Sequence, residues 1–308
     1  MKKEWAAISQ QGCGTFLTEG IIGANHRSRG IPCQDASLAG VYHYRGYPYG
    51  LLIVADGHGA TRYPRSDLGA HFAIQAGVEA AARWIMYAVD CLEQHPDDWF
   101  TELRNEFGQR FARKLRQVWQ RQVEEHLQDH PLTNNKDPES VYGTTVALAL
   151  VFQDYLFVGA IGDSKIFVIW NQQTDALAQN NSEEGLDVLA GSGGEHLGLT
   201  THSLASDHAV SKWHHRVLPL VDIGLVCVTT DGLSDSLADT RRTLAGIYQD
   251  SHSKGLDWLS RNLPGFLARL TEEGVGDDIA TAFYLPPAKE KELSAVKITT
   301  AHAGAKHE

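Results

Sequence analysis

The fold is decided by one stretch, LLIVADGHG at residues 51–59. Its run of apolar residues predicts a buried strand, which ends abruptly at Asp56. Gly57 and Gly59 permit a tight turn in which backbone groups approach whatever lies at the strand end. An Asp and a His have no packing role there, because a buried charge is costly unless it is paired or binds a metal. An ordinary Asp-Gly hairpin turn explains the same residues, so this stretch alone leaves both interpretations open.

The composition indicates a globular protein and argues against several functions. The 308 residues suffice for one large domain or two small ones, and 43% hydrophobic residues allow a sizeable core. A net charge of −11 argues against nonspecific nucleic-acid binding, which needs a basic surface. The four cysteines are scattered, which argues against a disulfide framework or a zinc ribbon. We see neither a signal peptide nor a membrane span, and we expect a cytoplasmic monomer.

The order of predicted elements indicates the fold class. We predict a hairpin of residues 5–8 and 15–17, a loop at 23–35, and paired strands at 41–45 and 50–55. A long helix follows over 66–92, and Asp97 and Asp98 cap a second helix. The apolar face of this second helix comprises Leu103, Phe107, Phe111, Leu115 and Val118. Further strands are predicted at 144–152, 155–161, 165–170, 217–220, 225–229 and 279–285, and helices at 240–248 and 256–270.

Two long helices without a strand between them do not fit a doubly wound sheet. They favour an α+β fold in which helices cover the outer faces of antiparallel sheets. We expect a single domain over residues 1–285. Residues 171–210 are polar and glycine-bearing, which predicts an irregular flap rather than core. The tail at 286–308 is expected to be disordered.

Carboxylates recur where predicted strands end. Asp56, Asp163 and Asp231 follow apolar strands in glycine-containing turns, and Asp277 immediately precedes the last strand. Clustered carboxylates repel each other unless hard cations neutralise them, and Mg²⁺ or Mn²⁺ suits such ligands. Two such ions can activate water for in-line attack on phosphorus. Each Asp-Gly pair is a weak signal, and the recurrence at four strand ends strengthens it.

Six short blocks, in this order, resemble the metal-dependent Ser/Thr protein phosphatases of the PP2C (PPM) family, in a bacterial-type version. They are QDA at 34–36, VADGHG at 54–59, YGTT at 142–145, GAIGDS at 159–164, TTDGLSD at 229–235 and GDDI at 276–279. The blocks span about residues 20 to 285, nearly the whole chain. The resemblance implies a four-layer αββα sandwich with the metal centre at one edge of the two sheets.

The resemblance also implies roles for the acidic residues. Asp56 would bridge two catalytic Mn²⁺ or Mg²⁺ ions, and Gly57 would offer its backbone carbonyl to one of them. Asp231 and Asp277 would complete the binuclear centre. Asp163 matches the position that helps to hold a third, weaker metal.

Further positions match residues that act on the substrate or support the ligands. His58 matches the general acid that protonates the leaving alkoxide, a suitable task for an imidazole near neutral pH. Asp278 stands where the family usually has Asn, and we expect it to support the metal ligands without binding a metal. We expect the same of Asp35, Gln34 and Asp235.

The first block departs from the family pattern in two ways. Gln34 replaces a Glu that contacts a metal through water in the family. Arg27 and Arg29 lie further from Asp35 than the phosphate-binding arginine of the family does. A guanidinium fork is the natural clamp for a phosphate, and we favour Arg29 for this role.

The leading interpretation is a protein phosphatase that hydrolyses phosphoserine and phosphothreonine by direct attack of a metal-activated water. Its substrates would be phosphoproteins, and it would oppose a Ser/Thr kinase in signalling. The altered first block motivates an alternative, a non-catalytic phosphoprotein-binding or scaffold module with the same fold. A third interpretation, a hydrolase of small phosphate esters, would use the same metals and differ in substrate access.

Overall fold

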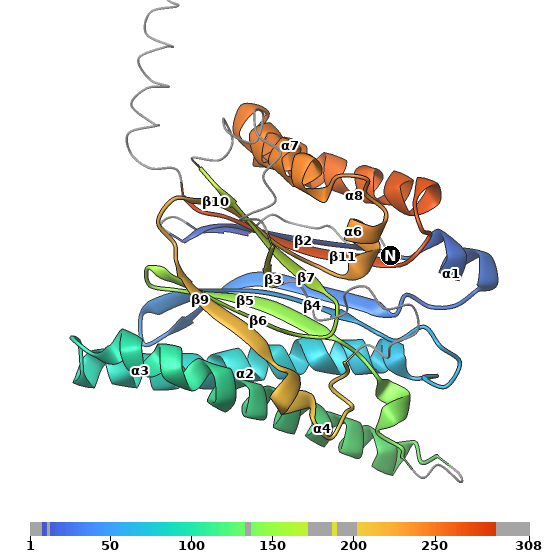
Figure 1. The fold of residues 1–308 in the computed structure, drawn as a ribbon, viewed down its shortest axis with the longest axis horizontal. Helices are drawn as coiled ribbons and strands as arrows, with labels where there is room; N and C mark the ends of the chain where they lie inside the picture. Colours follow the sequence, from blue (N-terminus) through green and yellow to red (C-terminus); the bar gives the residue numbers. More distant parts are fainter. Residues whose placement is uncertain (1–7, 11–12, 133–136, 172–186, 190–201, 288–308) are drawn as a thin grey trace, which may run out of the picture.

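The chain forms two antiparallel β-sheets that face each other, with helices on both outer faces (Figure 1). The computed structural model describes residues 8–10, 13–132, 137–171, 187–189 and 202–287. In spatial order the first sheet contains β1 (Ile8–Gln10), β2 (Gly14–Ile21), β11 (Ile279–Leu285), β10 (Ile223–Thr229), β7 (Lys165–Trp170) and β8 (Asp187–Leu189). The second contains β3 (Asp35–Tyr44), β4 (Tyr47–Asp56), β5 (Val146–Phe152), β6 (Tyr155–Ile161) and β9 (His214–Pro219). This confirms the predicted α+β, four-layer αββα sandwich.

The interior strand β4 is buried on both faces, as its apolar run predicts. Leu52 and Val54 belong to the core between the sheets, together with Val226 and Val228 of β10. The alternate residues Leu51 and Ile53 belong to a second core under the helices. Successive side chains of a strand point to opposite faces, so a strand between two cores must be apolar throughout.

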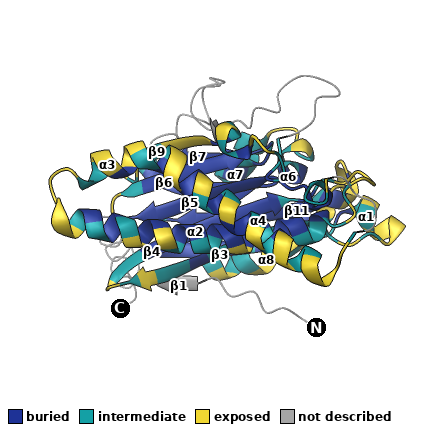
Figure 2. Cartoon of the chain, turned by 90° about the horizontal axis from the view of Figure 1, so that it is seen from below, coloured by how far each residue is buried: buried dark blue, intermediate teal, exposed yellow. Residues whose placement is uncertain are grey.

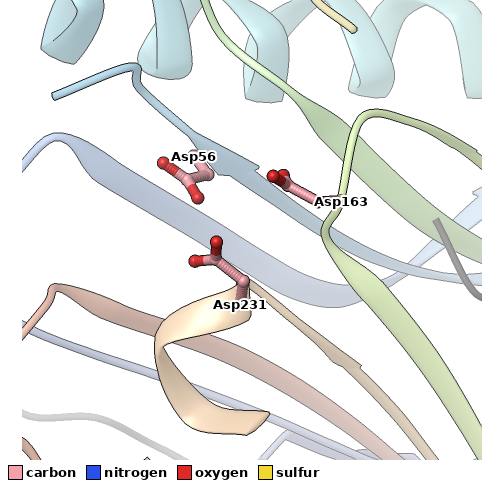
Figure 3. A group of neighbouring side chains, drawn as sticks. All are labelled: Asp56, Asp163 and Asp231. Carbon is pink, nitrogen blue, oxygen red and sulfur yellow. The ribbon is translucent and has the colours of Figure 1, made fainter. Parts of the chain in front are cut away.

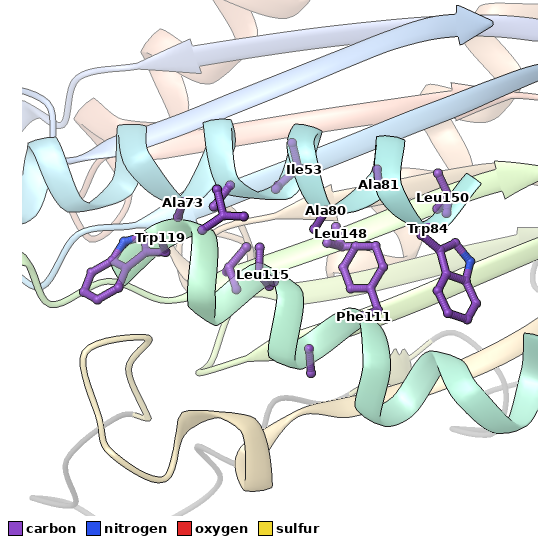
Figure 4. Close-up of a cluster of buried hydrophobic side chains, with 14 of the residues drawn as sticks. Ile53, Ala73, Ala80, Ala81, Trp84, Phe111, Leu115, Trp119, Leu148 and Leu150 are labelled. Atoms are coloured by element: carbon purple, nitrogen blue, oxygen red, sulfur yellow. The ribbon is translucent and has the colours of Figure 1, made fainter. Parts of the chain in front are cut away.

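Two long helices cover the second sheet. The first is α2 (Ser66–Gln94). The second is continuous and consists of α3 (Trp99–Glu106), a π-helical turn (Phe107–Phe111) and α4 (Ala112–Asp129). The predicted apolar face of the second helix is confirmed, since all five of its residues are buried. Figure 4 shows Trp84 and Phe111 between α2, α4 and the strands. On the opposite side, α7 (Thr240–Ser253) and α8 (Leu256–Glu273) pack on β10 and β11 through a third core. Exposed residues are accordingly concentrated on the outer faces of the helices (Figure 2).

Two short α-helices of the described residues were not predicted from the sequence. The segment interpreted as a loop at 23–35 contains α1 (Ala24–Arg29), which ends at Gly30 with φ of 67°. None of the residues of α1 is buried, so the segment lacks the apolar periodicity that would have indicated a helix. The acidic block after β10 forms α6 (Asp231–Asp235), which is a little over one turn long.

The predicted flap is only partly covered by the described residues. Residues 172–186 and 190–201 lie outside them, as does the predicted tail from residue 288 onward. The end of the flap does not fit the prediction of an irregular segment outside the core. Leu204 and Ala209 are fully buried in the core beneath α4, and residues Ala209–Lys212 form a 3₁₀ turn. Among the described helices, none combines the length and the apolar character that a membrane crossing requires.

Candidate metal centre and active site

Three carboxylates meet where the two sheets end. Oxygen atoms of Asp56, Asp163 and Asp231 all lie within 4.8 Å of one another. Asp56 ends β4, Asp163 lies in the turn between β6 and β7, and Asp231 begins α6 directly after β10 (Figure 3). The side chains therefore come from both sheets and converge on one point. This juxtaposition agrees with the prediction that carboxylates at separate strand ends form one cluster.

Further carboxylates flank this group. Asp35 begins β3 and pairs directly with Asp56 across the two strands. Asp277 precedes β11 and acts electrostatically on Asp56 and Asp231, although it is not a member of the closest group. One oxygen of Asp277 accepts the N–H of Asp278 at 2.9 Å. Five predicted site residues are thus in or beside the cluster, and Asp163 belongs to the group of three whose oxygens lie closest together.

The cluster is electrostatically strained without cations. Burial, and then the charges of Asp35 and Asp231, raise the pKa of Asp56 well above its ordinary range. Burial and the neighbouring Asp163 raise the pKa of Asp231 from 3.8 to about 6. Burial also raises the pKa values of Asp35 and Asp277. A cation bound among these carboxylates would favour their ionised form and so lower their pKa values.

Buried polar atoms without partners provide a test of whether a cation fits. Among the described residues, Oε1 of Gln34 and Oδ2 of Asp35 are buried and have no hydrogen-bond partner. A buried oxygen without a partner is unfavourable unless a water molecule or an ion contacts it. Both atoms belong to the first block, next to the carboxylate cluster. Hard, oxygen-preferring cations such as Mn²⁺ and Mg²⁺ fit this donor set.

Asp278 holds the first block in place. Its carboxylate is only 2% exposed, and it accepts the N–H of Gly23 at 2.6 Å and the N–H of Gln34 at 2.7 Å. Nδ1 of His26 hydrogen bonds the same carboxylate at 2.9 Å. Asp278 therefore fixes the loop that carries Gln34 and Asp35, and its role as a support of metal ligands stays a prediction.

Hydroxyl groups of the YGTT block fix the end of β4. Oγ1 of Thr145 accepts the N–H of Asp56 at 3.1 Å, and Oγ1 of Thr144 donates to the carbonyl of Asp56 at 2.9 Å. A side chain at Gly57 would lie 2.6 Å from the carbonyl oxygen of Ser66, so only glycine fits there. The sequence analysis assigned no role to these threonines, although the block that contains them was part of the family resemblance.

His58 is held at the edge of the cluster. Its backbone N–H donates to the carbonyl of Gly143 at 3.0 Å, and its ring nitrogen Nε2 is buried with no hydrogen-bond partner among the described residues. Burial lowers its pKa, Arg62 adds to this effect and Asp163 opposes it. The imidazole is therefore neutral near pH 7 in the free protein. An anionic phosphate ester beside the ring would favour the protonated form that a general acid needs.

The remaining predicted residues lie on α6 and α1. Asp235 is exposed on α6, 3.6 Å from Nζ of Lys165. Arg27 forms an ion pair with Glu272 of α8, so its guanidinium is already bound to a carboxylate. Arg29 is exposed on α1 and has no hydrogen-bond or ion-pair partner within the described segments, so its guanidinium is available to a ligand. Figure 1 places α1 at the same end of the sandwich as α6.

Comparison with known proteins identifies the family. The family model for protein phosphatase 2C matches residues 22–268, which is most of the chain. The chain belongs to the protein phosphatase 2C family. No curated protein sequence matches this phosphatase 2C chain significantly.

Solved structures of phosphatases share the fold. Serine/threonine phosphatase Stp1 from Staphylococcus aureus is 18% identical, with 92% of this chain and 100% of that chain covered at a TM-score of 0.53. Serine-threonine phosphatase 2C from Toxoplasma gondii is 11% identical, with coverages of 92% and 98% and a TM-score of 0.61. The catalytic domain of the phosphatase PstP, solved in complex with two manganese ions, is 16% identical, with coverages of 88% and 98% and a TM-score of 0.50.

Proposed function

We infer that this protein is a metal-dependent protein phosphatase that hydrolyses phosphoserine and phosphothreonine in proteins. The single observation that carries the inference is the group formed by Asp56, Asp163 and Asp231 in a chain of the protein phosphatase 2C family. A scaffold function would not require the carboxylates to gather at electrostatic cost. Nothing in the comparisons favours that alternative.

We propose that two Mn²⁺ or Mg²⁺ ions bind at this cluster. Asp56 would bridge the ions, the carbonyl of Gly57 and the carboxylates of Asp231 and Asp277 would complete the set, and Asp163 would contribute to a third, weaker site. When bound, such ions neutralise phosphoryl oxygens and lower the pKa of water. The close approach of Asp163 to Asp56 and Asp231 supports its inclusion among the ligands.

The chain's own groups then orient the substrate and move the proton. Arg29 would bind phosphoryl oxygens with its guanidinium, a group whose N–H donors suit bidentate contact with a phosphate. His58 would donate a proton to the leaving serine or threonine oxygen. The backbone of His58 is held by the hydrogen bond from its N–H to the carbonyl of Gly143, and its ring packs beside that of Tyr63.

The decisive experiment is hydrolysis of a phosphothreonine peptide with Mn²⁺, and again with a chelator. We expect turnover only with the metal. Asp56→Asn should lose turnover while retaining its fold, which circular dichroism would check. Asp154→Asn, which changes an exposed Asp in the β5–β6 hairpin, is the matched control and should remain active. Turnover that survives complete chelation, or a fully active Asp56→Asn variant, would contradict the proposed metal centre.

Other parts of the prediction remain proposals of the sequence analysis. They are a single domain over 1–285, a cytoplasmic monomer, an opposing Ser/Thr kinase, and a flap that controls access of the substrate. Small phosphate esters could enter an open site as well as phosphoproteins do. Comparing kcat/KM for p-nitrophenyl phosphate and for phosphopeptides would distinguish these two substrate classes.

A further inference from the structure

A row of side chains extends outward from His58. The ring centroids of His58 and Tyr63 are 4.9 Å apart, and the guanidinium carbon of Arg62 lies 4.7 Å from the centroid of Tyr63. Gly143 lies beneath both rings, because a Cβ there would be 2.6 Å from Cδ2 of His58 and 3.1 Å from Cδ1 of Tyr63. The absence of a side chain at Gly143 lets the two rings pack together.

The turn that carries this row is fixed by its backbone. The N–H of Tyr63 donates to the carbonyl of Ala60 at 2.8 Å, and the N–H of Ser66 donates to the carbonyl of Tyr63 at 3.2 Å. The N–H of Arg65 donates to the carbonyl of Val141 at 3.1 Å, which ties the turn to the segment under His58. The Tyr63 ring is thus a preorganised support for the Arg62 side chain, and stacking on an aromatic face suits a guanidinium.

His58 lies between the carboxylate cluster and the exposed turn. It follows Asp56 of the cluster by two residues, and its ring lies beside that of Tyr63 on the turn. Asp163 belongs to the carboxylate cluster, whereas Arg62 is on the exposed turn. Arg62 has no ion-pair partner in the described part of the chain, although the net charge of the protein is −11. An unpaired cation beside the active site of an acidic protein is available to an anionic ligand.

We propose that Arg62, supported by Tyr63, binds an acidic side chain of the substrate protein close to the phosphorylated residue. This inference rests on the proposed function, in which His58 protonates the leaving oxygen. The phosphoryl group would lie at the carboxylate cluster and the leaving oxygen at His58. The substrate polypeptide, which is part of the leaving group, therefore continues on the outer side of His58, where Tyr63 and Arg62 lie. The preferred substrates are phosphoproteins with Asp or Glu near the phosphorylated residue.

Paired phosphothreonine peptides test this specificity. The two peptides of a pair differ at a single position, which is Glu in one and Gln in the other. The varied position is one of the two residues before or the two residues after the phosphothreonine. For at least one position we expect kcat/KM of the wild type to favour Glu by about threefold at low ionic strength, as for an exposed ion pair, and less in high salt. Arg62→Ala should abolish the preference, Arg62→Lys should retain part of it, and Arg62→Glu should reverse it. Arg104→Ala, on α3, is the matched control and should keep the preference.

The small substrate p-nitrophenyl phosphate separates this role from others. It lacks a polypeptide, so its kcat/KM should be unchanged in Arg62→Ala. An equal loss for p-nitrophenyl phosphate and for every peptide would overturn the inference, because Arg62 would then bind the phosphoryl group itself. A wild type that is active but indifferent to Glu and Gln would also overturn it. A wild type inactive towards all these substrates would instead contradict the proposed function, and this inference with it.

Discussion

Replacing one carboxylate of the cluster should stabilise the metal-free protein. In Asp231→Asn the crowded negative charge disappears, while the size of the side chain is nearly unchanged. The pKa of Asp231 is raised from 3.8 to about 6, chiefly by burial and then by Asp163. The folded protein therefore binds more protons than the unfolded chain between these two values, so its free energy of unfolding falls as the pH rises through this window.

The size of the effect follows from the shift. A displacement from 3.8 to about 6 corresponds to roughly 3 kcal/mol of lost stability at pH 7.5, and to about 1 kcal/mol at pH 4.5. Because Asp231 is partly exposed, solvent screening reduces the value at pH 7.5 to about 2 kcal/mol. Asp231→Asn should therefore raise the free energy of unfolding at pH 7.5 by about 2 kcal/mol, with a smaller gain at pH 4.5.

Urea unfolding in the presence of a chelator measures this gain. The exposed control Asp154→Asn should show no such change at either pH. Adding Mn²⁺ should reverse the order, since an ion that binds only the folded state stabilises the wild type by about 2.7 kcal/mol at one hundred times its dissociation constant. An Asp231→Asn variant that is no more stable than the wild type at pH 7.5 without metal would refute the electrostatic argument. An equal gain at both pH values would assign the effect to packing instead of charge.

Two further substitutions test the positions of His58 and of the first block. Gly143→Ala places a Cβ 2.6 Å from Cδ2 of His58, so we expect about 1–3 kcal/mol of destabilisation in urea unfolding. We also expect a lower kcat with Mn²⁺ affinity unchanged, and an unaltered kcat would show that the direction of His58 is unimportant. His26→Ala removes a partner of the buried Asp278 carboxylate and should destabilise the protein by about 2 kcal/mol. Adding Asp278→Asn, the residue usual in the family, should recover part of this loss, and no recovery would contradict the pairing.

The elements that the sequence predicted well are those with a strong apolar pattern. The last strand was predicted at 279–285 and is observed there, because its apolar residues fill two cores and Pro286 follows. The interpretation of 23–35 as a loop missed α1, whose residues are all at least partly exposed. A short exposed helix is held by contacts distant in sequence, such as the hydrogen bond from Gly23 to Asp278, and these cannot be read from local periodicity.

The candidate site was predictable in residue type and less so in arrangement. The recurrence of Asp at four strand ends predicted one cluster of Asp56, Asp163, Asp231 and Asp277, because strand ends meet at one edge of a sandwich. The first three form the closest group, and Asp277 flanks them. The support that His26 gives to Asp278 was not predicted, since a lone His near a loop carries no signal of its partner. The row from His58 through Tyr63 to Arg62 was also missed, because the sequence does not show which of these side chains contact each other, although Arg62 follows His58 by only four residues.

The side chains between the two sheets change from apolar to acidic towards one end of the sandwich. Apolar side chains of both sheets fill most of the space between them, including Val54 and Val228. At the end that carries the carboxylate cluster, this apolar core gives way to carboxylates of both sheets, with Asp56 on one side and Asp231 on the other. Repulsion between these groups opposes the sandwich at this end, and cations bound there would join the two sheets. Ions bound at the proposed site would therefore offset the free energy that the carboxylates cost the metal-free fold.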